Sequence, residues 1–260
     1  MVYFVGGGVG DADFLTLKAV KILKKADIVV YSQCLDDSVF RFCSRKCRFV
    51  MINSMSREDM NAFLLREKDK CVVYVVEGSF ACFSTTQDRF DFCRRNGIAF
   101  SVIPGVSSLE ASASAVANEL LVPFVSNGLL VTYFDGPGNP LKGQTIEKWA
   151  GLGVSMAVFM VKPEEYPLLK RRLLDGGMER NIPAVVVQDA LRDKQKVVFT
   201  TVDGLDAVGE VSWFSVVLLG RSFSNLDGSY DFSFLLADSE FRRAEDFMLR
   251  ERPLEGVVQC

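Results

Sequence analysis

The strongest constraint on the fold is a regular alternation along the chain between short apolar runs and longer stretches of helical length. In the first half the apolar runs are rich in β-branched residues, which is typical of β-α units stacked on a largely parallel sheet. We expect strands there at 2–5, 27–32, 48–52, 71–76 and 99–103. The helices expected between them lie at 14–25, 36–44, 57–69, 84–96 and 107–118.

A second alternating series begins after the segment ELLVPFVSNG, which has no clean period and contains Pro123 and Gly128. Its expected strands lie at 129–134, 155–161, 184–188, 196–201 and 213–220, and its expected helices at 145–151 and 164–177. The strand at 196–201 follows its predecessor after a short polar turn, so part of this sheet should be antiparallel. We therefore predict two α/β domains with mainly parallel or mixed sheets. Their bounds are 1–118 for the N-terminal domain, 119–128 for a linker, 129–223 for the C-terminal domain and 224–260 for an acidic tail.

The composition excludes several kinds of chemistry. None of the 260 residues is histidine, which removes Ser-His-Asp and Cys-His nucleophiles, histidine-ligated zinc and the usual neutral-pH general base. A formal net charge of −3 is unlike the strongly basic face of nucleic-acid-binding proteins. No apolar run approaches the ~20 residues that span a bilayer. We therefore predict neither a nucleic-acid partner nor a membrane partner.

The seven cysteines are an odd number without a C-x-x-C pair, and no signal peptide precedes the first strand. This pattern indicates reduced thiols in a cytoplasmic protein. Cys43 and Cys47 are spaced to share a helix face, but two thiols without a second pair make a poor zinc site. We predict no metal site and interpret the cysteines as small buried hydrophobic residues.

Three loops that follow strands of the first series carry the candidate ligand site. The first, GGGVGDADFLT at 6–16, is a glycine-rich turn between a strand and a helix, which lets backbone approach a ligand closely. The second begins with Glu77-Gly78, and the third reads IPGVSS at 103–108. Because ligands of open α/β sheets bind beyond the carboxyl ends of strands, these loops should face one crevice. Each loop alone is also compatible with a ligand-free turn, and the serines of the third with plain helix capping.

Two nucleotide-binding motifs are missing from the first loop. The dinucleotide fingerprint G-x-G-x-x-G needs glycine where Asp11 stands, and a Walker A loop needs G-K-[ST]. A nicotinamide-dependent oxidoreductase is therefore not favoured.

Together and in this order, the segments resemble the tetrapyrrole (corrin/porphyrin) methyltransferase family over residues 1–223. GGGVGDADFLT with the later ADIVVY is similar to the family's N-terminal signature, IPGVSS to its third signature, and the segment from GGMERN to WFSVVLLGRSF to its C-terminal region. The resemblance implies two α/β domains with S-adenosylmethionine in the cleft between them, a tetrapyrrole substrate and a homodimer. The methyl group would pass to a macrocycle carbon and leave S-adenosylhomocysteine. Such a transfer depends mainly on alignment of donor and acceptor, so it is compatible with a chain that lacks histidine.

The resemblance also implies roles for single residues. Asp11 would face the macrocycle as the catalytic residue that handles a proton or orients the substrate, and Thr132 would lie at the cleft floor beside the substrate. The cofactor contacts would come from Val9, Gly78, Ser79, Cys82, Phe83, Ser107, Ser108, Phe159, Met160, Ala190 and Gly220.

The chain departs from the family in the second loop, where the usual G-D-P-x-x-Y-G reads GSFACFS. Ser79 replaces an aspartate and Phe80 a proline. These changes bear on cofactor binding more than on the fold, because folding constraints are weakest on loops.

The tail segment SFLLADSEFRRA, at 233–244, resembles that of cobalamin-pathway enzymes that methylate precorrin-4 or cobalt-precorrin-4 at ring carbon 11. We therefore expect a methyltransferase of this type. A family member with another acceptor and a non-catalytic binding protein on the same scaffold are the alternatives.

Overall fold

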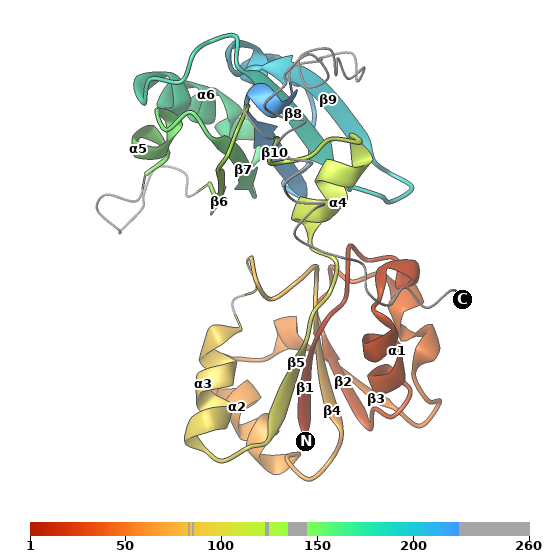
Figure 1. Ribbon diagram of the computed structural model, residues 1–260. Helices are drawn as coiled ribbons and strands as arrows, with labels where there is room; N and C mark the ends of the chain where they lie inside the picture. Colours follow the sequence, from red (N-terminus) through yellow and green to blue (C-terminus); the bar gives the residue numbers. More distant parts are fainter. Residues whose placement is uncertain (83, 85, 123–124, 135–144, 224–260) are drawn as a thin grey trace, which may run out of the picture. The chain divides into compact units, whose positions relative to one another are not determined.

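The computed structural model describes residues 1–223 except 83, 85, 123–124 and 135–144, and these residues form two compact units (Figure 1). The expected tail and its resemblance lie outside the described residues. Unit 1 comprises Met1–Ala115 together with Val187–Lys196 and Phe214–Val216. Unit 2 comprises Val116–Val186, Val197–Trp213 and the described chain from Val217 onward.

The sheet of unit 1 is entirely parallel, as the sequence predicts. Its strands lie in the order β3-β2-β4-β1-β5, and each neighbouring pair is parallel. Parallel strands place all their carboxyl ends at one edge, so the loops that follow these strands start from the same edge of the sheet. The bounds are β1 (Val2–Gly6), β2 (Ile28–Tyr31), β3 (Arg48–Met51), β4 (Val72–Val76) and β5 (Phe100–Ile103).

Helices cover both faces of this sheet (Figure 1). The side chains of Val73 and Val75 join α1 (Leu17–Leu23) in one apolar cluster, whereas Val72 and Tyr74 join α2 (Arg57–Arg66) in another. Successive side chains of a strand point to opposite faces, so the near-continuous apolar runs of the sequence correspond to strands buried on both sides. Unit 1 also contains α3 (Gln87–Arg95), α4 (Ser108–Ala115) and the short 3-10 helix η3 (Ile52–Ser54).

Two expected helices differ in the structure. The helix expected at 36–44 is the 3-10 helix η2 (Asp37–Phe42), which begins where the side chain of Asp36 accepts the Ser38 N–H at 2.8 Å. The helix expected at 14–25 is split into η1 (Ala12–Phe14) and α1, because the Thr16 side chain caps a new start by accepting the Ala19 N–H at 3.2 Å. Both differences come from short polar side chains that bond to nearby backbone in place of a continuous helix.

The second sheet is mixed, with strands in the order β6-β7-β10-β8-β9. β6 and β7 are parallel, whereas β10 runs against its neighbours. The Gly220 N–H, just after β10, donates to the Pro183 carbonyl at the start of β8 over 3.1 Å, and the Asp189 N–H, just after β8, donates to the Phe214 carbonyl over 3.2 Å. The bounds are β6 (Leu129–Tyr133), β7 (Ser155–Phe159), β8 (Pro183–Gln188), β9 (Lys196–Thr201) and β10 (Ser215–Leu219).

The helices of unit 2 pack on an apolar cluster that includes Met156, Leu169 and Val217. α6 ends at a glycine pair, and Gly177 has a left-handed φ of +90°, which is common for glycine just after a helix. The bounds are α5 (Ile146–Ala150), α6 (Tyr166–Asp175), η4 (Pro163–Glu165), η5 (Val202–Ala207) and η6 (Arg221–Phe223). None of the helices in the described part of the chain is long and apolar enough to cross a membrane.

Candidate cofactor site

The three glycine-containing loops meet at the carboxyl edge of the parallel sheet. The Gly78 N–H donates to the Gly8 carbonyl over 2.7 Å, and the Gly8 N–H donates back to the Gly78 carbonyl over 3.3 Å. Gly105 lies against both loops, because a Cβ on it would be 2.7 Å from the carbonyl carbon of Gly6 and would overlap the Gly78 carbonyl oxygen. The backbones are thus in direct contact, with no room for side chains at Gly6 and Gly105.

The bridging glycines adopt conformations that other residues avoid. Gly8 has a φ of +68° and Gly78 a φ of +64°, the left-handed region that costs a residue with a Cβ about 1 kcal/mol. These two glycines allow the loops to turn sharply and expose backbone amides at the sheet edge.

In the first loop, the Asp11 side chain is exposed and caps a helix. Its Oδ1 accepts the Asp13 N–H at 2.9 Å, at the start of η1. The loop is held to the segment after β2 by the Ala12 N–H, which donates to Ser38 Oγ over 3.2 Å. Val9 is half-buried between Gly8 and Gly10.

The structure brings together the predicted residues of the second and third loops. A Cβ on Gly78 would lie 3.7 Å from the Ser107 Cα and from the Ser108 nitrogen. Ser107 is buried, and its Oγ accepts the Leu109 N–H at 3.2 Å, so this serine caps α4. Ser79 Oγ accepts the Ala81 N–H at 3.4 Å, Cys82 is half-buried, and Phe83 lies outside the described residues.

The bulky Phe80, which replaces the family's proline, turns into the core. Its ring lies edge-on to Phe4 with a centroid distance of 6.3 Å, and 5.8 Å from the ring of Phe90. The extra volume of the second loop is therefore accommodated in an aromatic cluster, and the neighbouring Gly78 stays bonded to Gly8 at the sheet edge.

In the second sheet, the predicted positions after β7 and β8 carry strained backbone. Met160, after Phe159, has a φ of +60°, and Ala190 lies between Asp189 at +47° and Leu191 at +61°. Such conformations in residues other than glycine cluster at ligand sites. Thr132 of the edge strand β6 is in register with Val158 of β7, one residue before Phe159.

Gly220 is not brought together with Met160 and Ala190. It follows β10, which runs opposite to β7 and β8, and its missing Cβ would lie 3.1 Å from the Cα of Ser155 at the start of β7. A five-residue strand is about 16 Å long, so Gly220 is at the far edge of the sheet. The residue of this segment that lies at the same edge as Ala190 is Phe214, just before β10. The sequence did not point to Phe214, because an apolar run does not show in which direction a strand runs.

A second group missed from the sequence is a hydrogen-bonded cluster of Ser32, Cys34 and Glu77 between the ends of β2 and β4. The Ser32 hydroxyl donates to Glu77 Oε1 and accepts the Cys34 N–H at 3.1 Å. Burial raises the pKa of the Glu77 carboxyl, and burial and the nearby Glu77 charge raise the pKa of the Cys34 thiol. The sequence signal for this cluster is a charged residue directly after an apolar strand. That signal indicates the loop after β4 but does not indicate that Ser32 and Cys34 contact Glu77.

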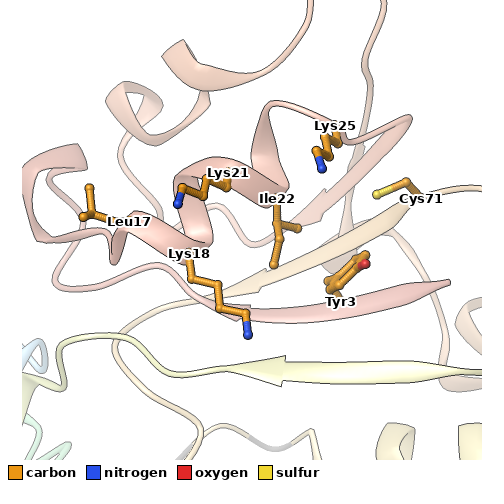
Figure 2. A pocket seen from close by; sticks show the side chains of 7 residues that line it. All are labelled: Tyr3, Leu17, Lys18, Lys21, Ile22, Lys25 and Cys71. Carbon is orange, nitrogen blue, oxygen red and sulfur yellow. The ribbon is translucent and has the colours of Figure 1, made fainter.

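A separate hollow of about 500 Å³ runs along α1 (Figure 2). Its lining combines three lysines with apolar side chains and includes Cys71, just before β4. None of the glycine loops contributes a lining residue, so this hollow is separate from the loop junction. The lining residues are Tyr3, Leu17, Lys18, Lys21, Ile22, Lys25 and Cys71.

The six cysteines that the structure describes are free thiols. Burial and the neighbouring Cys47 raise the pKa of Cys43 to about 12. Among the described residues, no group of three or more cysteine, aspartate or glutamate side chains is placed to hold a metal ion.

Comparison with known proteins decides the family. Residues 1–206 match the model of the tetrapyrrole (corrin/porphyrin) methylases. The chain belongs to the tetrapyrrole methylase family. The resemblance inferred from the loop motifs is therefore confirmed, and tetrapyrrole methylases use S-adenosylmethionine.

This tetrapyrrole methylase is 29% identical to a uroporphyrinogen-III C-methyltransferase of Bacillus subtilis over 222 residues, which cover 78% of this chain and 82% of the relative. Its fold is similar to that of a cobalt precorrin-4 methyltransferase, with a TM-score of 0.81, 25% identity and coverage of 85% of this chain and 95% of the other. It is also similar to a uroporphyrin-III C-methyltransferase of Thermus thermophilus complexed with S-adenosyl homocysteine, with a TM-score of 0.72, 26% identity and coverage of 85% and 97%.

Proposed function

We propose that this tetrapyrrole methylase transfers the methyl group of S-adenosylmethionine to ring carbon 11 of precorrin-4 or cobalt-precorrin-4. The observation that carries the proposal is the junction of the three loops, in which Gly8, Gly78 and Gly105 bring backbone together at the carboxyl edge of a parallel sheet. The higher TM-score to the cobalt precorrin-4 enzyme, 0.81 against 0.72, favours this acceptor. A uroporphyrinogen-III acceptor is the second candidate, favoured by the 29% identity to the Bacillus subtilis enzyme.

The residues at the loop junction fit this cofactor. S-Adenosylmethionine carries a carboxylate, an ammonium group and ribose hydroxyls, which need hydrogen-bond partners and close backbone. The α4 N-terminus at Ser108 offers N–H groups suited to a carboxylate, and Gly78 has no side chain to keep a ligand away. Bound there, the cofactor supplies a methyl group on a sulfonium, which is electrophilic and needs no metal or imidazole.

The chain's own contribution is alignment. Gly78, Ser79, Ser107 and Ser108 would hold the cofactor on unit 1, and Val9 and Cys82 would flank it. Asp11, exposed at the start of η1, would orient the macrocycle. Phe159, Met160, Ala190 and Thr132 stay predicted contacts from the second sheet. Fixing donor and acceptor in line is worth several kcal/mol of the barrier.

A transfer assay tests the acceptor. The full chain is incubated with S-adenosylmethionine carrying a labelled methyl group and with uroporphyrinogen III, precorrin-4 or cobalt-precorrin-4 in separate reactions. We expect label at carbon 11 of a precorrin-4 substrate. Label on another ring carbon would contradict the acceptor assignment, and no transfer to any tetrapyrrole would contradict the methyltransferase proposal. The homodimer and the cytoplasmic location stay predictions, of which the first is tested by the mass of the protein in solution.

A further inference from the structure

Glu77 is a carboxyl group that the proposed alignment of donor and acceptor does not use. It follows the last residue of β4 and precedes Gly78, the glycine bonded to the first loop. Its Oε1 accepts a hydrogen bond from the Ser32 hydroxyl, and Cys34 lies beside the same carboxyl group. The Cys34 N–H donates in turn to Ser32 Oγ over 3.1 Å, so the Cys34 backbone and the side chains of Ser32 and Glu77 form one connected group.

The partners of the half-buried Glu77 are neutral, and this distinguishes it from Glu67, a buried glutamate of the same domain. Glu67 lies within 2.9 Å of both Arg48 and Lys70, and these hydrogen bonds lower its pKa to about 2. In the part of the chain that the structure describes, no cation lies within ion-pair distance of Glu77. Burial raises the pKa of the Glu77 carboxyl above its ordinary value of 4.5, and the charge that acts on the cluster from another segment is that of Arg192, which lowers the pKa of Cys34.

The position of Glu77 places its carboxyl group on the side of the sheet where the first loop leaves it. Val73 and Val75 of β4 face the α1 side of the sheet, and the alternation of a strand puts Glu77 on that same side. The first loop leaves the sheet there, and the turn after β2 packs on it, because a Cβ on Gly7 would be 2.8 Å from Leu35 Cδ2. Glu77 therefore leaves the sheet on the same side as the first loop, which carries Asp11, and contacts the turn that packs on this loop.

We propose that Glu77 accepts the proton that the macrocycle releases on methylation, with Ser32 and Cys34 as positioning residues. The inference rests on the proposed methyl transfer. An electron pair of the ring forms the new C–C bond, the C–S bond breaks, and its electrons stay on sulfur as a neutral thioether. The ring is left with one positive charge, which it loses by giving a proton to the Glu77 carboxylate. The resulting carboxylic acid passes the proton to water, which restores the carboxylate for the next turnover.

The pH profile follows from the direction of the pKa shift. Glu77 must be ionised to accept a proton, and its folded pKa lies above the ordinary value of 4.5. The kcat of the wild type should therefore fall as the pH is lowered, and this fall should begin at a higher pH than for an ordinary glutamate. Ser32→Ala removes a donor that favours the charged carboxylate, so the acid limb should move to still higher pH.

The decisive variant is Glu77→Gln, which keeps the size of the side chain and cannot accept the proton. We expect kcat to fall by about 100-fold or more, with the KM for S-adenosylmethionine unchanged within a factor of about two and the acid limb lost. Glu77→Asp should have a higher kcat than Glu77→Gln and should again show the fall of kcat at acid pH. Glu67→Gln is the matched control, since it removes a buried glutamate of the same domain and should leave the pH profile of kcat as in the wild type.

The outcomes separate this inference from the function on which it rests. An active wild type whose kcat and acid limb are unchanged in both Glu77→Gln and Glu77→Asp would overturn the role of Glu77 alone. A wild type that transfers no methyl group to any tetrapyrrole would overturn both proposals. A Glu77→Gln protein with lost cofactor affinity would contradict the proton role, and Glu77→Asp with wild-type affinity and reduced kcat would support it.

Discussion

Gly8 and Gly78, 70 positions apart in the chain, exchange two backbone hydrogen bonds of 2.7 and 3.3 Å. This pair joins the loop after β1 to the loop after β4, and Gly105 packs on the junction from the loop after β5. The loops that resemble the family's signatures are thus parts of one contact, in which each fixes the position of the others.

Gly105→Ala should break this junction. The added Cβ would lie 2.7 Å from the carbonyl carbon of Gly6 and overlap the Gly78 carbonyl. Overpacking against fixed backbone costs about 1–3 kcal/mol, and the displaced loops should bind S-adenosylmethionine more weakly. Urea unfolding and calorimetry measure the two effects. A variant with wild-type stability and affinity would contradict the close packing of the three loops.

Gly78→Ala and Gly97→Ala form a matched pair for the cofactor site. Their φ values are +64° and +63°, so both variants should lose about 1 kcal/mol of stability from the left-handed backbone. Gly97 has no other atoms near its missing Cβ, whereas Gly78 lies beside Ser107 and Ser108. Only Gly78→Ala should weaken cofactor binding, and equal affinities in the two variants would argue against a ligand at Gly78.

Ser79→Asp should raise the affinity for S-adenosylmethionine. It restores the carboxylate that the family carries at this position, and a carboxylate accepts two hydrogen bonds from neighbouring ribose hydroxyls where a serine hydroxyl offers one oxygen. Ser79→Asn is the control of equal size without the charge. If calorimetry gives the same Kd for the wild type and Ser79→Asp, the second loop compensates for its missing aspartate.

Gly220→Ala tests which edge of the second sheet contributes to cofactor binding. Its φ of +143° and a Cβ position 3.1 Å from the Ser155 Cα predict a loss of stability of about 1–2 kcal/mol. Because Gly220 lies at the edge away from Met160 and Ala190, the Kd for S-adenosylmethionine should not change. Weaker cofactor binding in a folded Gly220→Ala protein would show that the family-based assignment of Gly220 holds.

Glu67 makes stability depend on acid pH. Hydrogen bonds from Lys70 and Arg48 lower its folded pKa from 4.5 to about 2, so its contribution is complete above the unfolded pKa and is lost as the pH falls from about 4.5 to 2. The urea midpoint of the wild type should fall across this window, and that of Glu67→Gln should fall less. If the urea midpoints of the two proteins fall equally steeply with decreasing pH, the assignment of this effect to Glu67 is contradicted.

The order of strands and helices could be predicted from the sequence because a strand buried on both faces is a continuous apolar run. The run that became β4 is apolar throughout, the run that became β7 is apolar apart from Ser155, and the glycine pair after α6 marks its end. Strand direction cannot be read in this way. The run that became β10 reads the same whichever way it lies, so the sequence could not show that Gly220 lies at the edge opposite to Met160.

The site itself could be predicted only where a single segment carries the information. The glycine loops and the capping serine Ser107 are local patterns. The bond from Ser32 to Glu77 joins residues 45 positions apart, and the burial of Phe80 against Phe4 depends on the packing of α3 and β5 around them. Such contacts follow from the assembled sheet and not from any one motif.

The most direct test of the central claim is a calorimetric titration of the full chain with S-adenosylmethionine and with S-adenosylhomocysteine. The account predicts saturable binding of both, with one site per chain, and weaker binding in Gly78→Ala than in Gly97→Ala. No binding of either compound at millimolar concentration would contradict a methyltransferase and would favour a protein that has kept the scaffold without the cofactor.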